Sequence, residues 1–83
     1  MKVLYFAWLR TKTGVSEETI APPDGVRTVA GLIEHLKARG GGYAEALRDL
    51  SAVRVAVNQE FAELDQAIGA NDEVALFPPV TGG

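Results

Sequence analysis

Residues 28–37 of the chain read Thr-Val-Ala-Gly-Leu-Ile-Glu-His-Leu-Lys, and this stretch predicts the helix around which the rest of the fold is organised. Its apolar residues are Val29, Leu32, Ile33 and Leu36. They follow the i, i+3, i+4, i+7 spacing that places side chains on one face of an α-helix. Thr28 is expected to cap the first turn through its hydroxyl, and the glycines at 40–42 are expected to end the helix.

Strand-like runs lie on both sides of this helix. Lys2–Leu9 is rich in β-branched and aromatic residues, and after a turn over residues 10–14 the weaker run Val15–Ala21 would complete a hairpin. A short second helix is expected over residues 43–50, and alternation over Val53–Val57 predicts a third strand. A short piece around Phe61 and a final strand over Glu73–Phe77 follow. The order predicts an α+β domain in which a mixed sheet wraps the long helix.

Aromatic side chains are predicted to gather on the outer face of this sheet. Only one face of an alternating strand can meet the helix. In the first strand the expected inward residues are Val3, Tyr5, Ala7 and Leu9, and the expected outward residues are Lys2, Leu4, Phe6 and Trp8. In the last strand Val74 and Leu76 are expected inside, and Ala75 and Phe77 outside.

An outward Phe6, Trp8 and Phe77, with Phe61 nearby, would form an exposed apolar surface of the kind at which other proteins dock. The alternative is that the two faces are reversed, or that these residues pack on one another.

Composition excludes several classes of function. A chain of 83 residues forms one domain, with little room for an enclosed catalytic pocket. The absence of cysteine excludes disulfides, a thiolate nucleophile and cysteine-ligated metals, and it fits a cytoplasmic protein. A net charge of −3 with dispersed basic residues argues against nucleic acid as a partner. No apolar run approaches 18 residues, so a membrane span is not expected.

Catalytic constellations are missing from the sequence. His35 lies in the middle of the long helix, off its apolar face, and is expected to be a solvated side chain that binds no metal. Ser16 and Ser51 have no histidine at a suggestive spacing, so a hydrolytic triad is not predicted. The adjacent acids at 17–18 and 72–73 would point to opposite strand faces, and each is expected to be solvated charge.

The sequence ends Pro-Pro-Val-Thr-Gly-Gly over residues 78–83, which indicates an arm that carries a reactive end. The two prolines cannot continue a strand and favour an extended path. Glycine allows backbone to enter a cleft too narrow for a Cβ, and six residues extend roughly 20 Å. The reactive group would then be the α-carboxylate of Gly83. The alternative is a disordered end without function.

Two stretches carry a resemblance to a known family. Val55–Gln59 and Asn71–Gly83, with the ending Phe-Pro-Pro-Val-Thr-Gly-Gly, resemble the small subunit of molybdopterin synthase, and the order of elements agrees along the whole chain. The resemblance implies a ubiquitin-like β-grasp domain over residues 1–77 and a flexible Gly-Gly tail over 78–83. It also implies a sulfur carrier in molybdenum cofactor biosynthesis.

In that family a partner of the ubiquitin-activating type, an adenylyltransferase, uses ATP to adenylate the terminal glycine. A sulfur donor system then converts it to a thiocarboxylate, and the large synthase subunit delivers the sulfur to cyclic pyranopterin monophosphate. The resemblance implies that Gly83 carries the sulfur and that Gly82 gives access. The residues implied to contact partners are Phe6, Trp8, Phe61, Phe77, Pro78, Pro79, Val80 and Thr81.

By the same resemblance this chain would be the non-catalytic subunit of a heterotetramer. It would bind no cofactor itself, because the ATP site and the pterin pocket belong to the partners. The alternatives are a sulfur carrier for thiamine thiazole synthesis, a ubiquitin-like protein modifier, and a plain interaction domain that does not need Gly83.

Overall fold

The computed structural model describes residues 1–79, which form five strands, three α-helices and one 3-10 helix. In chain order these elements are β1 (Lys2–Tyr5), α1 (Trp8–Thr13), β2 (Glu17–Thr19), α2 (Val29–Lys37), α3 (Gly41–Ala46), η1 (Leu50–Ala52), β3 (Arg54–Val57), β4 (Glu60–Ala62) and β5 (Glu73–Phe77). The predicted strands at Val53–Val57, Phe61 and Glu73–Phe77 are confirmed as β3, β4 and β5.

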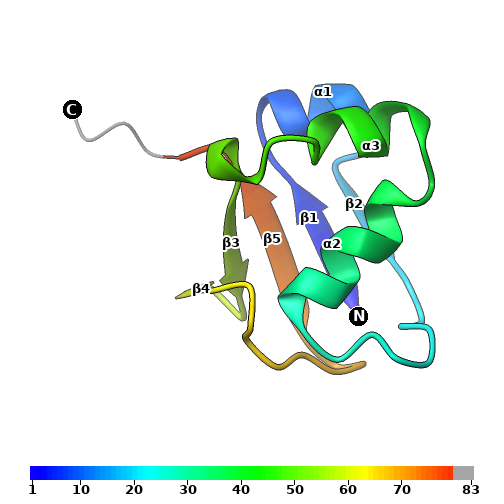
Figure 1. Ribbon diagram of the computed structural model, residues 1–83. Coiled ribbons are helices and arrows are strands. Elements are labelled where there is room, and N and C mark those ends of the chain that lie inside the picture. The colour runs from blue at the N-terminus through cyan, green and yellow to red at the C-terminus, as the bar shows by residue number, and fades with distance from the viewer. Residues whose placement is uncertain (80–83) are drawn as a thin grey trace.

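The strands form one mixed sheet in the order β2-β1-β5-β3-β4 (Figure 1). β1 and β5 run parallel, with Val3 opposite Val74 and Tyr5 opposite Leu76. The other pairs, β1 with β2, β3 with β5, and β3 with β4, are antiparallel. The first and last strands therefore lie side by side in the sheet, and the short strands β2 and β4 form its two edges.

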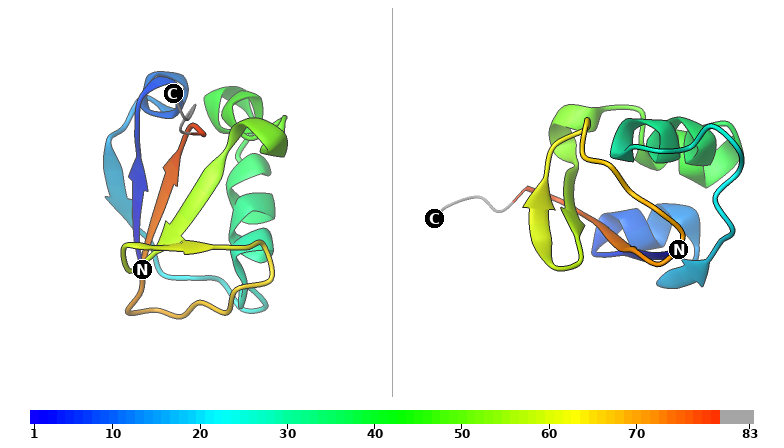
Figure 2. Two further views of the ribbon diagram at one scale, coloured as in Figure 1. Left: turned by 90° about the vertical axis from the view of Figure 1, so that its left-hand side faces the viewer. Right: turned by 90° about the horizontal axis from the view of Figure 1, so that it is seen from below.

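Helix α2 crosses one face of the sheet, and α3 lies on the same side (Figure 2). The predicted cap is confirmed, because the Gly31 N–H donates to the Thr28 hydroxyl at 3.2 Å. The predicted apolar face of α2 is buried: Val29, Leu32, Ile33 and Leu36. A mixed sheet that wraps one central helix is the β-grasp architecture, so the predicted fold class is confirmed.

Alternation along the strands supplies the other half of the core. Val3 and Tyr5 of β1 and Val74 and Leu76 of β5 are buried, as predicted. Ala75 and Phe77 are half-buried on the opposite face. The predicted inward face of the last strand is therefore correct, and the outer face of the sheet carries the remaining side chains.

The first strand is shorter than predicted, because it ends at Tyr5 and is followed by α1. The reversal occurs at Ala7, which has φ 54° and ψ −131°, a backbone conformation that residues with a Cβ rarely adopt. Ala7 is exposed and not inward as predicted, whereas Leu9 is buried from the helix. Gly14, at φ 84°, ends α1 in the left-handed conformation and donates its N–H to Arg10.

The three glycines do more than end a helix. α2 ends at Lys37, Gly40 precedes α3, and Gly41 and Gly42 belong to its first turn. A Cβ on Gly42 would overlap the carbonyl oxygen of Lys12 in α1. The backbones of α1 and α3 thus touch where only glycine fits. The second helix predicted over residues 43–50 is divided into α3 and η1.

Glu18 is not the solvated carboxylate that the sequence predicted. One oxygen accepts hydrogen bonds from the hydroxyls of Tyr5 at 2.8 Å and Tyr43 at 2.9 Å, and the other accepts from Arg39 at 2.8 Å. The Arg39 guanidinium also lies 4.8 Å from the centre of the Tyr43 ring. Through the Glu18 carboxylate, these contacts tie β1 and β2 to α3, which contains Tyr43, and to Arg39 in the segment that precedes it.

The second adjacent pair of acids is not merely solvated either. The Asp72 carboxylate accepts from the side-chain amide of Asn58 at 3.0 Å and from the Gly69 N–H at 2.8 Å. The first of these contacts lowers the pKa of Asp72 most, followed by the second. Asp72 therefore closes the turn that leads into β5.

The Glu18 cluster predicts a dependence of stability on acid. Burial alone would raise the pKa of Glu18, but hydrogen bonds from Arg39, Tyr5 and Tyr43 outweigh it and hold that pKa below its ordinary value. In the unfolded chain the carboxyl takes up a proton near pH 4.3, about its ordinary pKa, whereas the folded carboxyl resists to a lower pH. Stability contributed by Glu18 is thus complete above about pH 4.3 and is lost as the pH falls through the folded pKa.

Glu18→Gln is expected to lower the free energy of unfolding at pH 7 by about 2 kcal/mol, since charge-assisted hydrogen bonds are lost. The acid dependence should become shallower in the same variant. Urea unfolding between pH 7 and 3 measures both. Glu17→Gln is the matched control, because Glu17 forms only an exposed ion pair with Lys2 at 3.3 Å and should change stability by less than about 0.5 kcal/mol. Equal acid profiles for Glu18→Gln and the wild type would contradict this assignment.

Candidate docking surface

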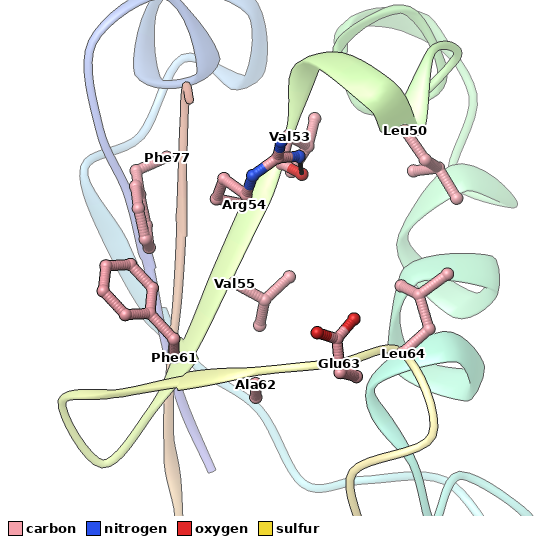
Figure 3. A pocket seen from close by; sticks show the side chains of 9 residues that line it. All are labelled: Leu50, Val53, Arg54, Val55, Phe61, Ala62, Glu63, Leu64 and Phe77. Carbon is pink, nitrogen blue, oxygen red and sulfur yellow. Dashed lines mark hydrogen bonds between the residues drawn. The ribbon is translucent and has the colours of Figure 1, made fainter. Parts of the chain in front are cut away.

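Two phenylalanines meet on the sheet face that α2 does not cover. The ring centres of Phe61 and Phe77 lie 5.8 Å apart, with an angle of 47° between the ring planes. Phe61 is 80% exposed, which is unusual for a phenylalanine and leaves most of its ring in water. The predicted outward orientation of Phe77 and the predicted position of Phe61 near it are confirmed, and Figure 3 shows the two rings beside each other.

The local backbone explains how these rings come together. β3 and β4 form a tight hairpin through Asn58 and Gln59, both with positive φ, at 51° and 70°. Two consecutive residues with positive φ are typical of a type I′ turn. The twist of this turn matches the twist of the two strands that a two-residue loop connects. The hairpin pairs Phe61 with Ala56, and Ala56 pairs in turn with Ala75. Because the side chains of Ala56 and Ala75 are small, the Phe61 ring can reach across β3 to the ring of Phe77.

Phe6 lies at the same end of the sheet as Phe77. Its N–H donates to the Leu76 carbonyl at 3.1 Å, which places the Phe6 backbone beside the last residues of β5. Phe6 is 48% exposed, as predicted. Trp8 is also exposed, but it begins α1 and does not lie on the strand, so its predicted position on the strand face is wrong. We call Phe6, Phe61 and Phe77 the aromatic surface.

A groove opens next to the aromatic surface, between β4 and η1 (Figure 3). Its volume is about 660 Å³. It is lined by Leu50, Val53, Arg54, Val55, Phe61, Ala62, Glu63, Leu64 and Phe77. The sequence did not predict this groove, because its lining comes from four separate segments. The one available signal was Leu64, an apolar residue between the piece around Phe61 and the final predicted strand, and it is 44% exposed.

The arm predicted from the sequence begins at the end of β5, next to the aromatic surface. Pro78 and Pro79 follow Phe77 directly and are half-buried. The other predicted arm residues, Val80, Thr81, Gly82 and Gly83, lie outside the described residues.

Residues 1–79 contain no arrangement that suggests catalysis. Ser51 donates to Asp49 at 2.6 Å within the first turn of η1, which is a local helix cap. His35 is half-buried on α2, and Ser16 is exposed in the turn before β2. Within this part of the chain no three histidine or acidic side chains are grouped to hold a metal ion. None of its helices has the length and apolar character needed to cross a membrane.

A family model described as the ThiS family matches residues 3–83, nearly the full length of the sequence. The chain belongs to the ThiS family. This ThiS-family chain is 40% identical over 83 residues to the molybdopterin synthase sulfur carrier subunit of Haemophilus influenzae. That comparison covers 100% of the chain and 99% of the relative. The resemblance predicted from the sequence is therefore confirmed.

Solved structures similar to the ThiS-family chain share its fold. A putative molybdopterin converting factor, subunit 1, from Pyrococcus furiosus is 38% identical, with a TM-score of 0.76 and coverage of 95% of both chains. SAMP1 from Haloferax volcanii, a small archaeal modifier protein, is 33% identical, with a TM-score of 0.74. That comparison covers 100% of this chain and 98% of the other. Sulfur carriers and modifiers are thus both represented among its relatives.

Proposed function

We propose that this protein is the sulfur carrier subunit of a molybdopterin synthase and acts in the cytoplasm. Gly83 is adenylated at its carboxylate, converted to a thiocarboxylate, and donates sulfur to cyclic pyranopterin monophosphate inside the large subunit. The observation that carries the proposal is full-length similarity to sulfur carrier subunits, combined with an exposed aromatic surface at the root of the Gly-Gly arm.

The chemistry divides between this chain and its partners. A terminal carboxylate has a pKa of about 3.3–3.7, so it is ionised at neutral pH and resists nucleophiles until it is activated. In this proposal an adenylyltransferase partner supplies the ATP site for that step. A sulfur donor system and the large subunit supply the remaining steps. This chain binds no cofactor and contributes the arm over residues 78–83 and the surface that docks it.

Reconstitution tests the proposal. The protein is coexpressed with an adenylyltransferase and a sulfur donor, and its intact mass should show one oxygen replaced by sulfur. The thiocarboxylate form, mixed with the large subunit and cyclic pyranopterin monophosphate, should yield the dithiolene product and return the carboxylate. Sulfur transfer to a thiazole precursor, with none to the pterin, would assign the protein to thiamine synthesis instead.

A second candidate function is a protein modifier, which similarity to SAMP1 favours. In that role Gly83 would form an isopeptide bond with lysine amines of other proteins. Mass spectrometry of cell extracts distinguishes the two. A modifier is joined through Gly83 to lysines of many proteins, and trypsin would leave the branch 55–83 on each, because Arg54 is the last basic residue of the chain. A carrier accumulates the thiocarboxylate.

Phe77→Arg is expected to weaken binding to the large subunit by roughly 30-fold or more, because a charge would be buried on docking without a partner. Titration calorimetry measures the affinity, and circular dichroism should show a native fold. Thr19→Arg, which adds the same charge on the exposed edge strand β2, is the control and should bind normally. Should Phe77→Arg unfold the protein, Phe61→Ser tests the same surface, since that side chain is 80% exposed. Unchanged binding in both variants would refute the docking surface.

A further inference from the structure

The groove beside the aromatic surface holds one cation and one anion above an apolar floor. Val53 and Val55 form the floor and are only 6% and 5% exposed. Arg54 lies on the β3 side, and Glu63 follows β4 on the opposite side (Figure 3). Both charged side chains belong to exposed residues. The groove therefore offers an apolar base with opposite charges at its two margins.

The Arg54 guanidinium makes only weak contacts. It donates to the backbone carbonyls of Ser51 at 3.5 Å and Val53 at 3.4 Å, both at the long limit for a hydrogen bond. It is not among the four ion pairs that residues 1–79 form. Arg39, by contrast, holds a carboxylate at 2.8 Å. Arg54 thus keeps its planar set of donors available for an external group.

Docking on the aromatic surface necessarily reaches Arg54. In the register of β3 and β5, Arg54 stands directly opposite Phe77, and both residues line the groove together with Phe61. A protein that covers the two phenylalanine rings therefore removes water from the guanidinium as well. Burying the guanidinium without an anion would cost more free energy than covering the two rings contributes. The covering surface must therefore supply an anion.

We propose that the groove receives a segment of the large subunit that carries a carboxylate beside an apolar side chain. The carboxylate pairs with Arg54 through two parallel hydrogen bonds, and the apolar side chain fills the space above Val53 and Val55. Glu63, at the other margin, repels the carboxylate of the segment. The segment therefore binds in one orientation, with its carboxylate beside Arg54. This inference rests on the proposed function and adds the chemistry by which the partner is recognised.

Charge reversal at Arg54 tests the pairing. With the large subunit from the organism that supplies this chain, Arg54→Glu is expected to weaken binding by roughly 30-fold or more, as for a buried charge pair that is broken. Arg54→Lys should bind more tightly than Arg54→Gln, because lysine keeps the positive charge that glutamine lacks. Lysine does not keep the planar set of donors that arginine has. Arg27→Glu is the matched control: it makes the same change in net charge at an exposed residue that does not line the groove, and it should bind within about threefold of the wild type.

Each outcome decides the proposal. If Arg54→Glu binds within about threefold of the wild type, or Arg27→Glu weakens binding equally, no specific pair exists. If the isolated protein dimerises on analytical ultracentrifugation, and Arg54→Glu abolishes the dimer without changing the affinity for the large subunit, the groove belongs to a second copy. Thermal unfolding verifies that each variant is folded. Failure of the wild type to bind the large subunit overturns the proposed function itself, and this inference with it.

Discussion

Deletion of Gly83 is expected to abolish sulfur transfer while the melting temperature stays within about 3 °C of the wild type. The deletion leaves the terminal α-carboxylate on Gly82, one residue short of the position at which we propose that Gly83 is activated. The folded body should not respond, because the buried core extends only from Met1 to Leu76. Assay of dithiolene formation with the reconstituted synthase, together with differential scanning calorimetry, measures both effects.

Two further variants sharpen this experiment. Amidation of the C-terminus should be as inactivating as the deletion, since an amide cannot be adenylated at the same oxygen. Thr81→Ser keeps the length of the arm and its terminal carboxylate, so it should remain active. A Gly83 deletion that still supports cofactor synthesis would end the sulfur carrier proposal, and it would favour an interaction domain.

Gly42→Ala is expected to destabilise the protein by about 3 kcal/mol or more, because the new methyl group would overlap the Lys12 carbonyl, which belongs to the backbone and cannot rotate away. For a domain of this size, the melting temperature should fall by roughly 15 °C or more. Thermal unfolding followed by circular dichroism measures the change. Separation of α1 from α3 would relieve the overlap at the expense of their packing.

Gly69→Ala is the matched control for this prediction. A Cβ at Gly69 would meet no atom within 4 Å, and Gly69 is not among the glycines with positive φ. The control should therefore have nearly wild-type stability. Similar melting temperatures for Gly42→Ala and Gly69→Ala would show that α1 and α3 can separate freely, in contradiction to the close contact described above.

Periodicity predicted the central helix and most of the sheet because those segments obey local rules. Val29, Leu32, Ile33 and Leu36 repeat with the helical period and are all buried. The alternation in Glu73–Phe77 likewise assigned Val74 and Leu76 to the core. In each case the element packs against a single layer, so only one of its faces is buried. The periodicity of apolar residues is then sufficient to predict which side chains are in the core.

The turn into α1 escaped prediction for a local reason. Leu9 continues the period-two series that begins at Val3 and Tyr5, so the segment resembled one long strand. The chain instead reverses at Ala7, where neither glycine nor asparagine marks a positive φ. Tertiary packing imposes this conformation, and a propensity-based prediction cannot detect it.

Contacts between distant segments were also invisible in the sequence. Glu18 finds Arg39 and Tyr43 at separations of 21 and 25 residues, and nothing near Glu18 indicates them. The three consecutive glycines at 40–42 partly indicated the close contact at Gly42. One glycine is enough to end a helix, so the end of α2 does not explain the third. The aromatic surface could be predicted from alternation, but the groove with Arg54 required the hairpin to be folded against η1.

The parallel pairing of β1 with β5 has a consequence for synthesis of the protein. A ribosome releases β1 first and β5 last, yet β5 lies between β1 and β3 in the finished sheet. The emerging chain therefore cannot form the complete sheet until translation has passed Phe77. A product that terminates earlier lacks the strand that joins the two halves, and it remains an unfolded substrate for proteases. Only translation products that include β5 can therefore form the complete sheet and present the aromatic surface.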